Sequence, residues 1–342
     1  MLEKILKLIL SLALMFVVVG CTKEEKETTN EKEETKEEIK EEVKEPEKVE
    51  LTLSFIGDLT LGNYAGQGYS GSFDQEYVNQ GKDTGYFLKN VKSILEKDDL
   101  TIGNLEGPLT NEESHAQKKF AFKGKKEYAK ILTDGSVEIV TLANNHSQDR
   151  FEKGFNDTKQ TLDNNNIKYF GYENSYIAEV KGIKIGFIGL SFPQEYGSMT
   201  KKLMSELKDQ TDLIILYVHW GIERDPAPMA SQRKLAQTWI DNGVDLVIGS
   251  HPHVLQGIET YKGKKIVYSL GNFCFGGNKN PADKDTMIYQ HTFQFEDKKV
   301  VKESNKIIPC MITSHKSRNN YQPTVVEGND AKRVLKKVND IK

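Results

Sequence analysis

Five apolar segments of this chain each run into a side chain that can bind a metal ion, and this repetition constrains the fold more than any other feature. The segments occupy residues 51–56, 99–102, 137–142, 212–218 and 245–250. Unbroken apolar runs are typical of buried strands in α/β proteins, and ligands collect in the crevice beyond the carboxyl ends of such strands. The sequence therefore predicts an α/β protein with a binding site at one edge of its sheets.

The side chains that follow these segments are carboxylates, amides and imidazoles. In chain order they are Asp58, Glu106, Asn145, His146, His219, His251 and His253. Oxygen and nitrogen ligands without a thiolate suit Mn²⁺, Fe or Zn²⁺, so a cysteine-rich metal site is not expected. Each residue alone has a simpler explanation, because an aspartate after a strand often caps a turn or a helix. The prediction rests on their recurrence.

The number of candidate ligands predicts two divalent metal ions (Mn, Fe or Zn). The metal-ligand candidates are Asp58, Glu106, Asn145, His219, His251 and His253, which exceeds the set of about four that one tetrahedral zinc needs. Two ions about 3.5–4 Å apart, bridged by a carboxylate, would neutralise a phosphoryl group and activate a water. His146 follows Asn145 directly, and we assign it as the general acid that protonates the leaving oxygen. Asn104 and Asp149 either orient the ligands from behind or form turns.

Six strings carry a resemblance to a known family. They are Phe-Ile-Gly-Asp-Leu-Thr-Leu (55–61), Gly-Asn-Leu-Glu-Gly-Pro-Leu-Thr (103–110), Leu-Ala-Asn-Asn-His (142–146), His-Trp-Gly (219–221), Gly-Ser-His-Pro-His (249–253) and Tyr-Ser-Leu-Gly-Asn-Phe (268–273). In this order they resemble the calcineurin-like metallophosphoesterase superfamily and, within it, the CapA (PgsA) family of poly-γ-glutamate capsule biosynthesis proteins. The resemblance implies a four-layer αββα sandwich of two mixed sheets.

The resemblance also implies a role for each ligand. Asp58 and His253 would bind one metal, Glu106 would bridge, and His146 would be the acid. The second metal would be bound by Asn145, His219 and His251. The general Asp-x-His block of the superfamily appears here as Asp58-Leu59-Thr60, and its bridging aspartate appears as Glu106. With one imidazole fewer, the first metal is expected to be the more weakly bound.

The family context implies partners and leaves the activity open. The expected partners are poly-γ-glutamate or another anionic polymer, and membrane-bound capsule synthesis subunits. The protein is then either a metal-dependent hydrolase or transferase on a phosphate-bearing or γ-glutamyl substrate, or a non-catalytic subunit for assembly or export of the polymer. An extracellular metal or nucleotide binder is a third alternative. With 47 basic and 50 acidic residues and a net charge of −3, the chain carries no nucleic-acid signature.

The front of the chain predicts attachment to the cell membrane. Residues 1–21 are typical of a lipoprotein signal peptide, and the string Val-Val-Gly-Cys (18–21) resembles a lipobox that leaves Cys21 as the lipid-modified amino terminus. An uncleaved membrane anchor is the alternative, and both place the domain outside the cytoplasm. The Lys/Glu-rich residues 22–50 predict a disordered or partly helical stalk. The domain is then expected over residues 51–325, with a tail over 326–342.

The order of the expected helices, strands and hairpins predicts mixed sheets. Helices are expected at residues 85–97, 124–132, 154–165 and 228–242, and hairpins at 176–190, 257–270 and 287–308. Helices that alternate with strands favour parallel pairing, whereas the hairpins favour antiparallel pairing. Cys274 and Cys310 are far apart in the sequence, and free thiols are favoured over a disulfide between them.

Overall fold

The computed structural model describes residues 46–192 and 197–339. The predicted signal peptide with Cys21, and the stalk up to residue 45, lie outside the described residues. Within the described ranges, no helix has the length and apolar character that crossing a membrane requires. The first strand, β1 (Lys48–Thr60), begins inside the segment that we assigned to the stalk, so the folded domain starts slightly earlier than predicted.

The first of two large sheets has eight strands and is built around β1. Its order is β16 (Thr324–Val325), β15 (Lys299–Met311), β14 (Asp285–Glu296), β1, β3 (Leu100–Leu105), β5 (Ile139–Thr141) and β6 (Lys168–Phe170), while β13 (Asn272–Phe275) also pairs with β1. The strands β1, β3, β5 and β6 are parallel. The strands β14, β15 and β16 pair antiparallel, so the sheet is mixed as predicted.

The second large sheet has six strands. Its order is β11 (Ile258–Tyr261), β12 (Lys264–Val267), β10 (Leu246–Ser250), β9 (Leu213–His219), β8 (Ile183–Ser191) and β7 (Tyr176–Val180). Its four central strands are parallel, and the edge strands β7 and β11 are antiparallel members of hairpins. The three predicted hairpins are thereby confirmed. A small sheet pairs β2 (Asn63–Tyr64) with β4 (Phe122–Lys123).

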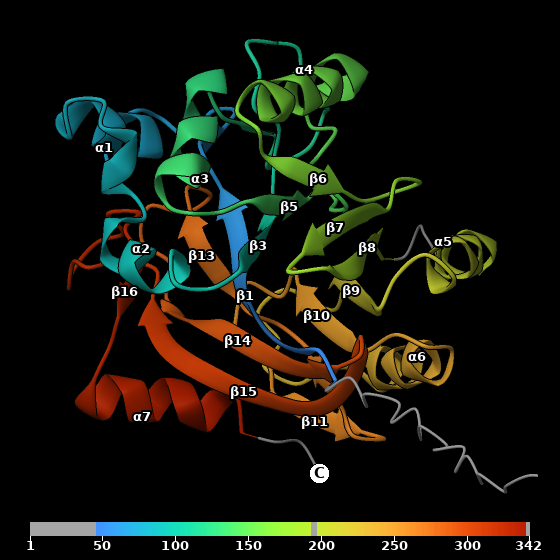
Figure 1. Ribbon diagram of the computed structural model, residues 1–342. Coiled ribbons are helices and arrows are strands. Elements are labelled where there is room, and N and C mark those ends of the chain that lie inside the picture. The colour runs from blue at the N-terminus through green and yellow to red at the C-terminus, as the bar shows by residue number, and fades with distance from the viewer. Residues whose placement is uncertain (1–45, 193–196, 340–342) are drawn as a thin grey trace, which may run out of the picture. The chain divides into compact units, whose positions relative to one another are not determined.

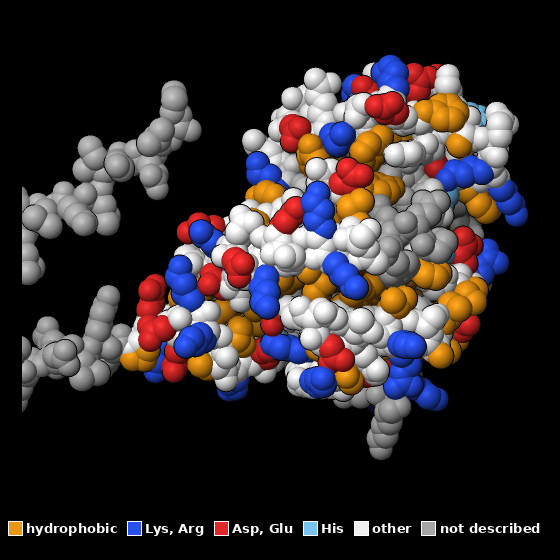
Figure 2. All heavy atoms as spheres, turned by 90° about the vertical axis from the view of Figure 1, so that its right-hand side faces the viewer, with side chains coloured by type: hydrophobic (Ala, Val, Ile, Leu, Met, Phe, Trp, Pro, Cys, Tyr) orange, Lys and Arg blue, Asp and Glu red, His pale blue; other side chains and the backbone are white. Residues whose placement is uncertain are grey.

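Helices cover the outer faces of both large sheets (Figure 1). Beside the first sheet lie α1 (Phe73–Asn79), α2 (Lys89–Leu95), α3 (Ala129–Asp134) and α4 (Phe151–Asn164), together with the short 3-10 helices η1 (Thr84–Tyr86) and η2 (Lys126–Tyr128). Beside the second sheet lie α5 (Ser198–Lys208) and α6 (Ala230–Asp241). On the face where α5 and α6 lie, acidic and basic side chains are interspersed (Figure 2).

Three buried hydrophobic clusters separate these layers. Along β9, the alternating residues Leu213, Ile215 and Tyr217 belong to a cluster that also contains Leu53 and Phe55 of β1, so this cluster fills the space between the sheets. The residues between them on β9 belong to a second cluster with α5 and α6. A third cluster joins the first sheet to α1–α4. Because successive side chains of a strand point to opposite faces, both sheets are covered on both sides. This confirms the predicted αββα sandwich.

The carboxyl-terminal segment is more ordered than a tail. Helix α7 (Gly328–Lys337) lies within residues 326–342 and packs on β14 and β15. Arg333 forms an ion pair with Asp285 of β14 at 2.7 Å, and Val334 is fully buried in the cluster between the sheets. Residues 328–337 are therefore part of the folded unit. Cys274 and Cys310 are both buried free thiols.

Candidate metal centre

The strand register brings the predicted ligands to one edge of the sandwich. Asp58 of β1 lies opposite Asn104 of β3 and opposite Asn272 of β13. On the second sheet, His219 ends β9 opposite Ser250, the last residue of β10. Parallel strands end at the same edge of a sheet, so residues far apart in sequence converge there.

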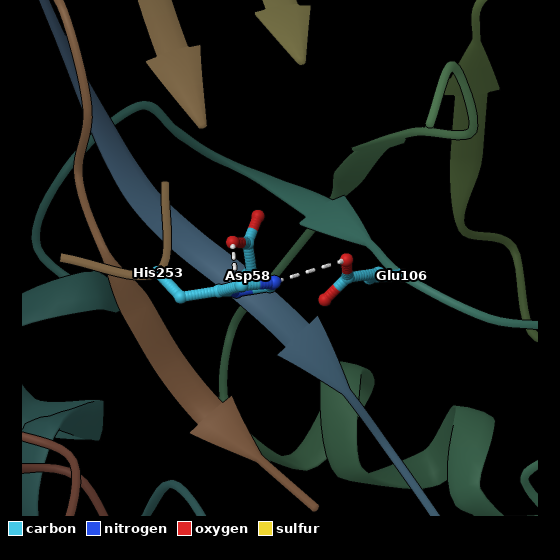
Figure 3. Close-up of side chains that lie close together, drawn as sticks. All are labelled: Asp58, Glu106 and His253. Atoms are coloured by element: carbon cyan, nitrogen blue, oxygen red, sulfur yellow. Dashed lines mark ion pairs between the residues drawn. The ribbon is translucent and has the colours of Figure 1, made fainter. Parts of the chain in front are cut away.

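Asp58, Glu106 and His253 form one compact group (Figure 3). One ligand atom from each lies within 4.8 Å of the others. The Nδ1 atom of His253 is 3.2 Å from Oδ2 of Asp58, and its Nε2 atom is 3.8 Å from Oε1 of Glu106. Both carboxylates are buried. Two carboxylates and one imidazole form a ligand set for Mn²⁺, Fe or Zn²⁺.

Asn145, His219 and His251 form a second group beside the first. The Nε2 atom of His219 is 2.8 Å from Oδ1 of Asn145 and 3.0 Å from Nδ1 of His251. Ligand atoms about 2.0–2.2 Å from a shared metal ion approach one another to about this separation. The three predicted ligands of the second metal are thus brought together.

Glu106 connects the two groups. Its Oε1 atom lies 3.7 Å from Nε2 of His219 and 3.8 Å from Nε2 of His253. Among the described residues, Oε1 of Glu106 and Oδ2 of Asp58 are buried without a hydrogen-bond donor. A buried carboxylate oxygen without a donor is costly, and a cation satisfies it. The arrangement therefore fits metal binding between these side chains.

Burial and charge set different protonation states for the three histidines. Burial holds the pKa of His219 well below its usual value, helped by the other imidazoles, and it lowers the pKa of His251 as well. At His253 burial also acts to lower the pKa, but Glu106 and Asp58 outweigh it and raise the pKa to about 10. Burial raises the pKa of Glu106, with Asp58 adding to the effect and His253 opposing it. Neutral imidazole is the metal-binding form, so His219 and His251 are already in that form at neutral pH.

The turn that carries His251 and His253 has an unusual backbone. Both residues have positive φ angles, of 97° and 58°, which residues other than glycine rarely adopt. The carbonyl of Pro252 between them accepts a hydrogen bond of 2.7 Å from the backbone N–H of Arg224. Such strain persists where surrounding structure fixes it, and it is concentrated at functional sites.

His146 is held beside the ligands by Asp149. Its Nδ1 atom is 2.7 Å from Oδ2 of Asp149, which also accepts a hydrogen bond of 2.6 Å from the backbone of Phe122. Lys118 pairs with the other oxygen of Asp149. The His146 ring packs on Phe122 with centroids 4.4 Å apart. The geometry places Asp149 where a residue that orients His146 would lie.

Asn104, the other predicted orienting residue, bridges both groups. Its Nδ2 atom donates to Oδ1 of Asp58 at 2.8 Å and lies 3.2 Å from Nδ1 of His219. Its Oδ1 atom accepts from Asn144 at 3.0 Å. Asn144 in turn accepts from the backbone N–H of His146 at 3.0 Å, so the amides link both groups to the loop of His146.

Thr60 and Asn272 also contact the ligands and were not predicted as site residues. Thr60, at the position of the missing imidazole, donates its hydroxyl to Oε2 of Glu106 at 2.8 Å. Asn272 places Oδ1 2.9 Å from Nδ1 of His253 and donates to its backbone carbonyl at 3.2 Å. The available signal for Asn272 was its position shortly after the mostly apolar residues 266–270, because the predicted ligands also follow apolar segments.

Gly249 allows the close packing that supports the His251 turn. A Cβ atom at this position would lie 2.1 Å from the carbonyl oxygen of Tyr268 and 2.6 Å from Nε1 of Trp220. The buried Trp220 donates to that same Tyr268 carbonyl at 2.9 Å. The end of β10 therefore has no room for a side chain at Gly249.

Comparison with known proteins identifies relatives over most of the domain. The PGA biosynthesis protein CapA of Bacillus subtilis (strain 168) is 31% identical over 269 residues, which are 70% of this chain and 67% of that protein. The capsule biosynthesis protein CapA of Bacillus anthracis is 28% identical over 275 residues, which are 72% of this chain and 64% of that protein. The chain thus spans about two thirds of the length of each of these relatives.

A solved structure and a family model also match. The crystal structure of a hypothetical protein from Thermus thermophilus is 17% identical, with a TM-score of 0.45, and the match covers 76% of this chain and 99% of that one. The model of the bacterial capsule synthesis protein PGA_cap matches residues 52–277, which contain every predicted ligand. Because this match extends over more than half of the sequence, the chain belongs to the PGA_cap family of bacterial capsule synthesis proteins.

Proposed function

We propose that this protein is a lipid-anchored, extracytoplasmic protein for the synthesis or export of poly-γ-glutamate, and that it carries a dinuclear metal site. The family assignment and the relatives named for PGA and capsule biosynthesis support the biological role. The observation that carries the metal site is the position of Glu106, whose Oε1 atom lies within 3.8 Å of imidazoles from both groups.

Each group of residues would hold one ion. Asp58 and His253 would hold the first and Glu106 would be shared, while Asn145, His219 and His251 would complete the second. Bound there, the ions would supply charge neutralisation for a phosphoryl or carbonyl oxygen and an activated water. Thr60 contributes a hydroxyl to Glu106 rather than an imidazole to the first ion, so we infer that the first site is the weaker.

If the protein is an enzyme, we propose that His146 transfers the proton. Asp149 engages Nδ1 of His146 and leaves Nε2 as the nitrogen that can face a substrate. The carboxylate of Asp149 orients the ring, and Lys118 pairs with the other oxygen of that carboxylate. His146 then gives its proton to the leaving oxygen and recovers one from solvent.

A non-catalytic role in polymer assembly is the second candidate. The threonine at position 60 favours it, since the first metal group then has two carboxylates and a single imidazole among its described residues. On this alternative the metal ions would hold an anionic polymer without cleaving it. A site can persist on a fold whose chemistry has changed.

The substitution His146→Ala separates the two candidates. We expect turnover of phosphodiester or poly-γ-glutamate substrates with Mn²⁺ to fall by about 10²–10⁴-fold, the range for loss of a general acid. Metal content should stay at the wild-type value, because His146 is not a proposed ligand. His315→Ala, which removes a histidine outside the site, is the matched control. A wild-type turnover rate in His146→Ala would contradict its assignment as the general acid. Absence of turnover in the wild-type protein, or capsule formation that needs the gene but not His146, would support assembly instead.

The proposed anchor is tested by Cys21→Ser. We expect the wild-type protein to incorporate labelled fatty acid and to sediment with membranes, and the variant to lose the label, because serine offers no thiol for lipid attachment. Cys274→Ser is the matched control, since that thiol is buried in the folded unit. A variant that remains with the membrane without label would favour the uncleaved membrane anchor.

A further inference from the structure

A cavity of about 880 Å³ opens beside His146 and His253 and extends away from the proposed metal ligands. An aromatic wall formed by Tyr64, Phe120, Phe122 and Phe275 lines it. This wall contacts the site at both ends, since Phe122 packs on His146 and Phe275 packs on His253, at centroid distances of 4.4 and 5.2 Å. The cavity is therefore continuous with the metal centre and larger than a single phosphate requires.

Positive charge dominates the cavity wall. Lys119, Arg224 and Lys279 line it, against the two acids Glu223 and Asp283. Asp283 is already paired, since both of its carboxylate oxygens accept hydrogen bonds of 2.8 Å from Lys337 of α7. Lys279 donates to the backbone carbonyl of Ser70, which leaves its charge uncompensated. The wall thus has more cationic groups than free carboxylates.

Arg224 lies at this wall in a loop that is fixed by hydrogen bonds. Its φ angle of 64° is in the left-handed region, where glycine or asparagine would be less strained. Its backbone N–H bonds to Pro252, between His251 and His253. The buried Gln256 holds the same loop from beneath by donating to the carbonyls of Asp225 and Ala227, at 2.9 and 3.2 Å. The loop is thus tied to the turn that carries two proposed ligands.

In contrast to its backbone, the side chain of Arg224 is not held by an ion pair among the described residues. It is exposed, and no ion pair of its guanidinium is found within residues 46–192 and 197–339. A fixed backbone with an uncommitted guanidinium is suited to binding an anion, because a guanidinium presents paired donors to a carboxylate or phosphate.

We propose that Arg224 is a specificity residue that binds an anionic group of an extended polyanion, one repeat or more from the group held at the metal centre. The aromatic wall would pack against the apolar part of the chain between these groups. The inference deepens the proposed function, on which its link to the metal centre rests, and it assigns to Arg224 a preference for polymer over a single anion. Carboxylate and phosphodiester chains share the repeating negative charge that this wall would recognise.

The test measures binding rather than turnover. The full-length protein is titrated calorimetrically in EDTA and again with Mn²⁺, with a γ-linked pentaglutamate, a pentamer of glycerol phosphate, and free glutamate as probes. We expect one pentamer to bind at least tenfold more tightly than glutamate, and Arg224→Gln to remove this advantage. Arg224→Lys should retain part of it, since it keeps the charge but not the paired donors.

Lys302→Gln, which removes an equal charge from the exposed hairpin strand β15, is the matched control and should bind like the wild type. The two probes distinguish a carboxylate polymer from a phosphodiester polymer. The inference is overturned if neither pentamer binds more tightly than glutamate, or if Arg224→Gln binds both like the wild type. The EDTA titration keeps this outcome separate from a failure of the metal-site proposal, because Arg224 is not a metal ligand.

Discussion

If the proposed dinuclear site forms, replacing Glu106 with glutamine is expected to remove both metal ions at once. The carboxylate lies between the two groups of ligands, within 3.8 Å of His219 on one side and of His253 on the other. A neutral amide cannot balance the charge of two cations. The affinity for metal should therefore fall by more than the roughly 10–100-fold that is typical when a residue hydrogen-bonded to a metal ligand is replaced. Elemental analysis after dialysis against Mn²⁺ measures the loss as ions per chain.

The matched control is Glu223→Gln, which removes a carboxylate from the cavity wall but not from the ligand groups. It should keep the wild-type metal content. Glu106→Gln should remain folded, because the amide oxygen can still accept the Thr60 hydroxyl, and circular dichroism checks this. If Glu106→Gln kept both ions at wild-type affinity, the shared-ligand arrangement would be wrong.

The substitution Gly249→Ala is expected to cause a large loss of stability. Its Cβ atom would lie 2.1 Å from the backbone oxygen of Tyr268, which is held by Trp220 and cannot rotate away as a side chain would. Overpacking of this kind costs about 3 kcal/mol, at the upper end of the usual range. Urea unfolding in EDTA measures the loss without a contribution from metal binding.

Gly186→Ala provides the comparison on β8 of the same sheet. There a Cβ atom would meet only the ends of the Leu207 and Thr211 side chains, the nearest at 2.9 Å, and these can move. We expect a cost of about 1 kcal/mol, at the lower end of the range. Equal losses for the two variants would show that the rigid Tyr268 carbonyl is not what restricts position 249.

Local sequence signals predicted the hairpins and the helices α4 and α6. The turns of two hairpins contain the pairs Lys181-Gly182 and Lys262-Gly263, which adopt the positive φ angles that such tight turns need. Helix α4 follows the predicted residues 154–165 closely. Helix α1 was missed, and a helix of seven residues depends on tertiary packing more than on its own sequence. Helix α5 was also missed, although Leu203 and Leu207 have helical spacing.

The sequence predicted residues of the candidate site but not the hydrogen bonds between them. Asp58 and His219 could be identified because each follows an apolar run, and this edge of the sheets is where such runs end. The hydrogen bond from Thr60 to Glu106 could not be, because it depends on the register between strands whose residues are 46 positions apart. The same holds for the contact between Asn272 and His253, because Asn272 lies on β13, which pairs with β1, and His253 lies in the turn after β10.

Because the proposed ligands come from both sheets, a metal ion bound there would link the two halves of the sandwich. Asp58 and Glu106 come from strands β1 and β3 and the loop that follows, whereas His219 and His251 come from β9 and the turn after β10. Separation of the halves would dismantle the centre, so the free energy of ion capture adds directly to the free energy that keeps them closed. Metal scarcity would then loosen the whole sandwich as well as empty its site.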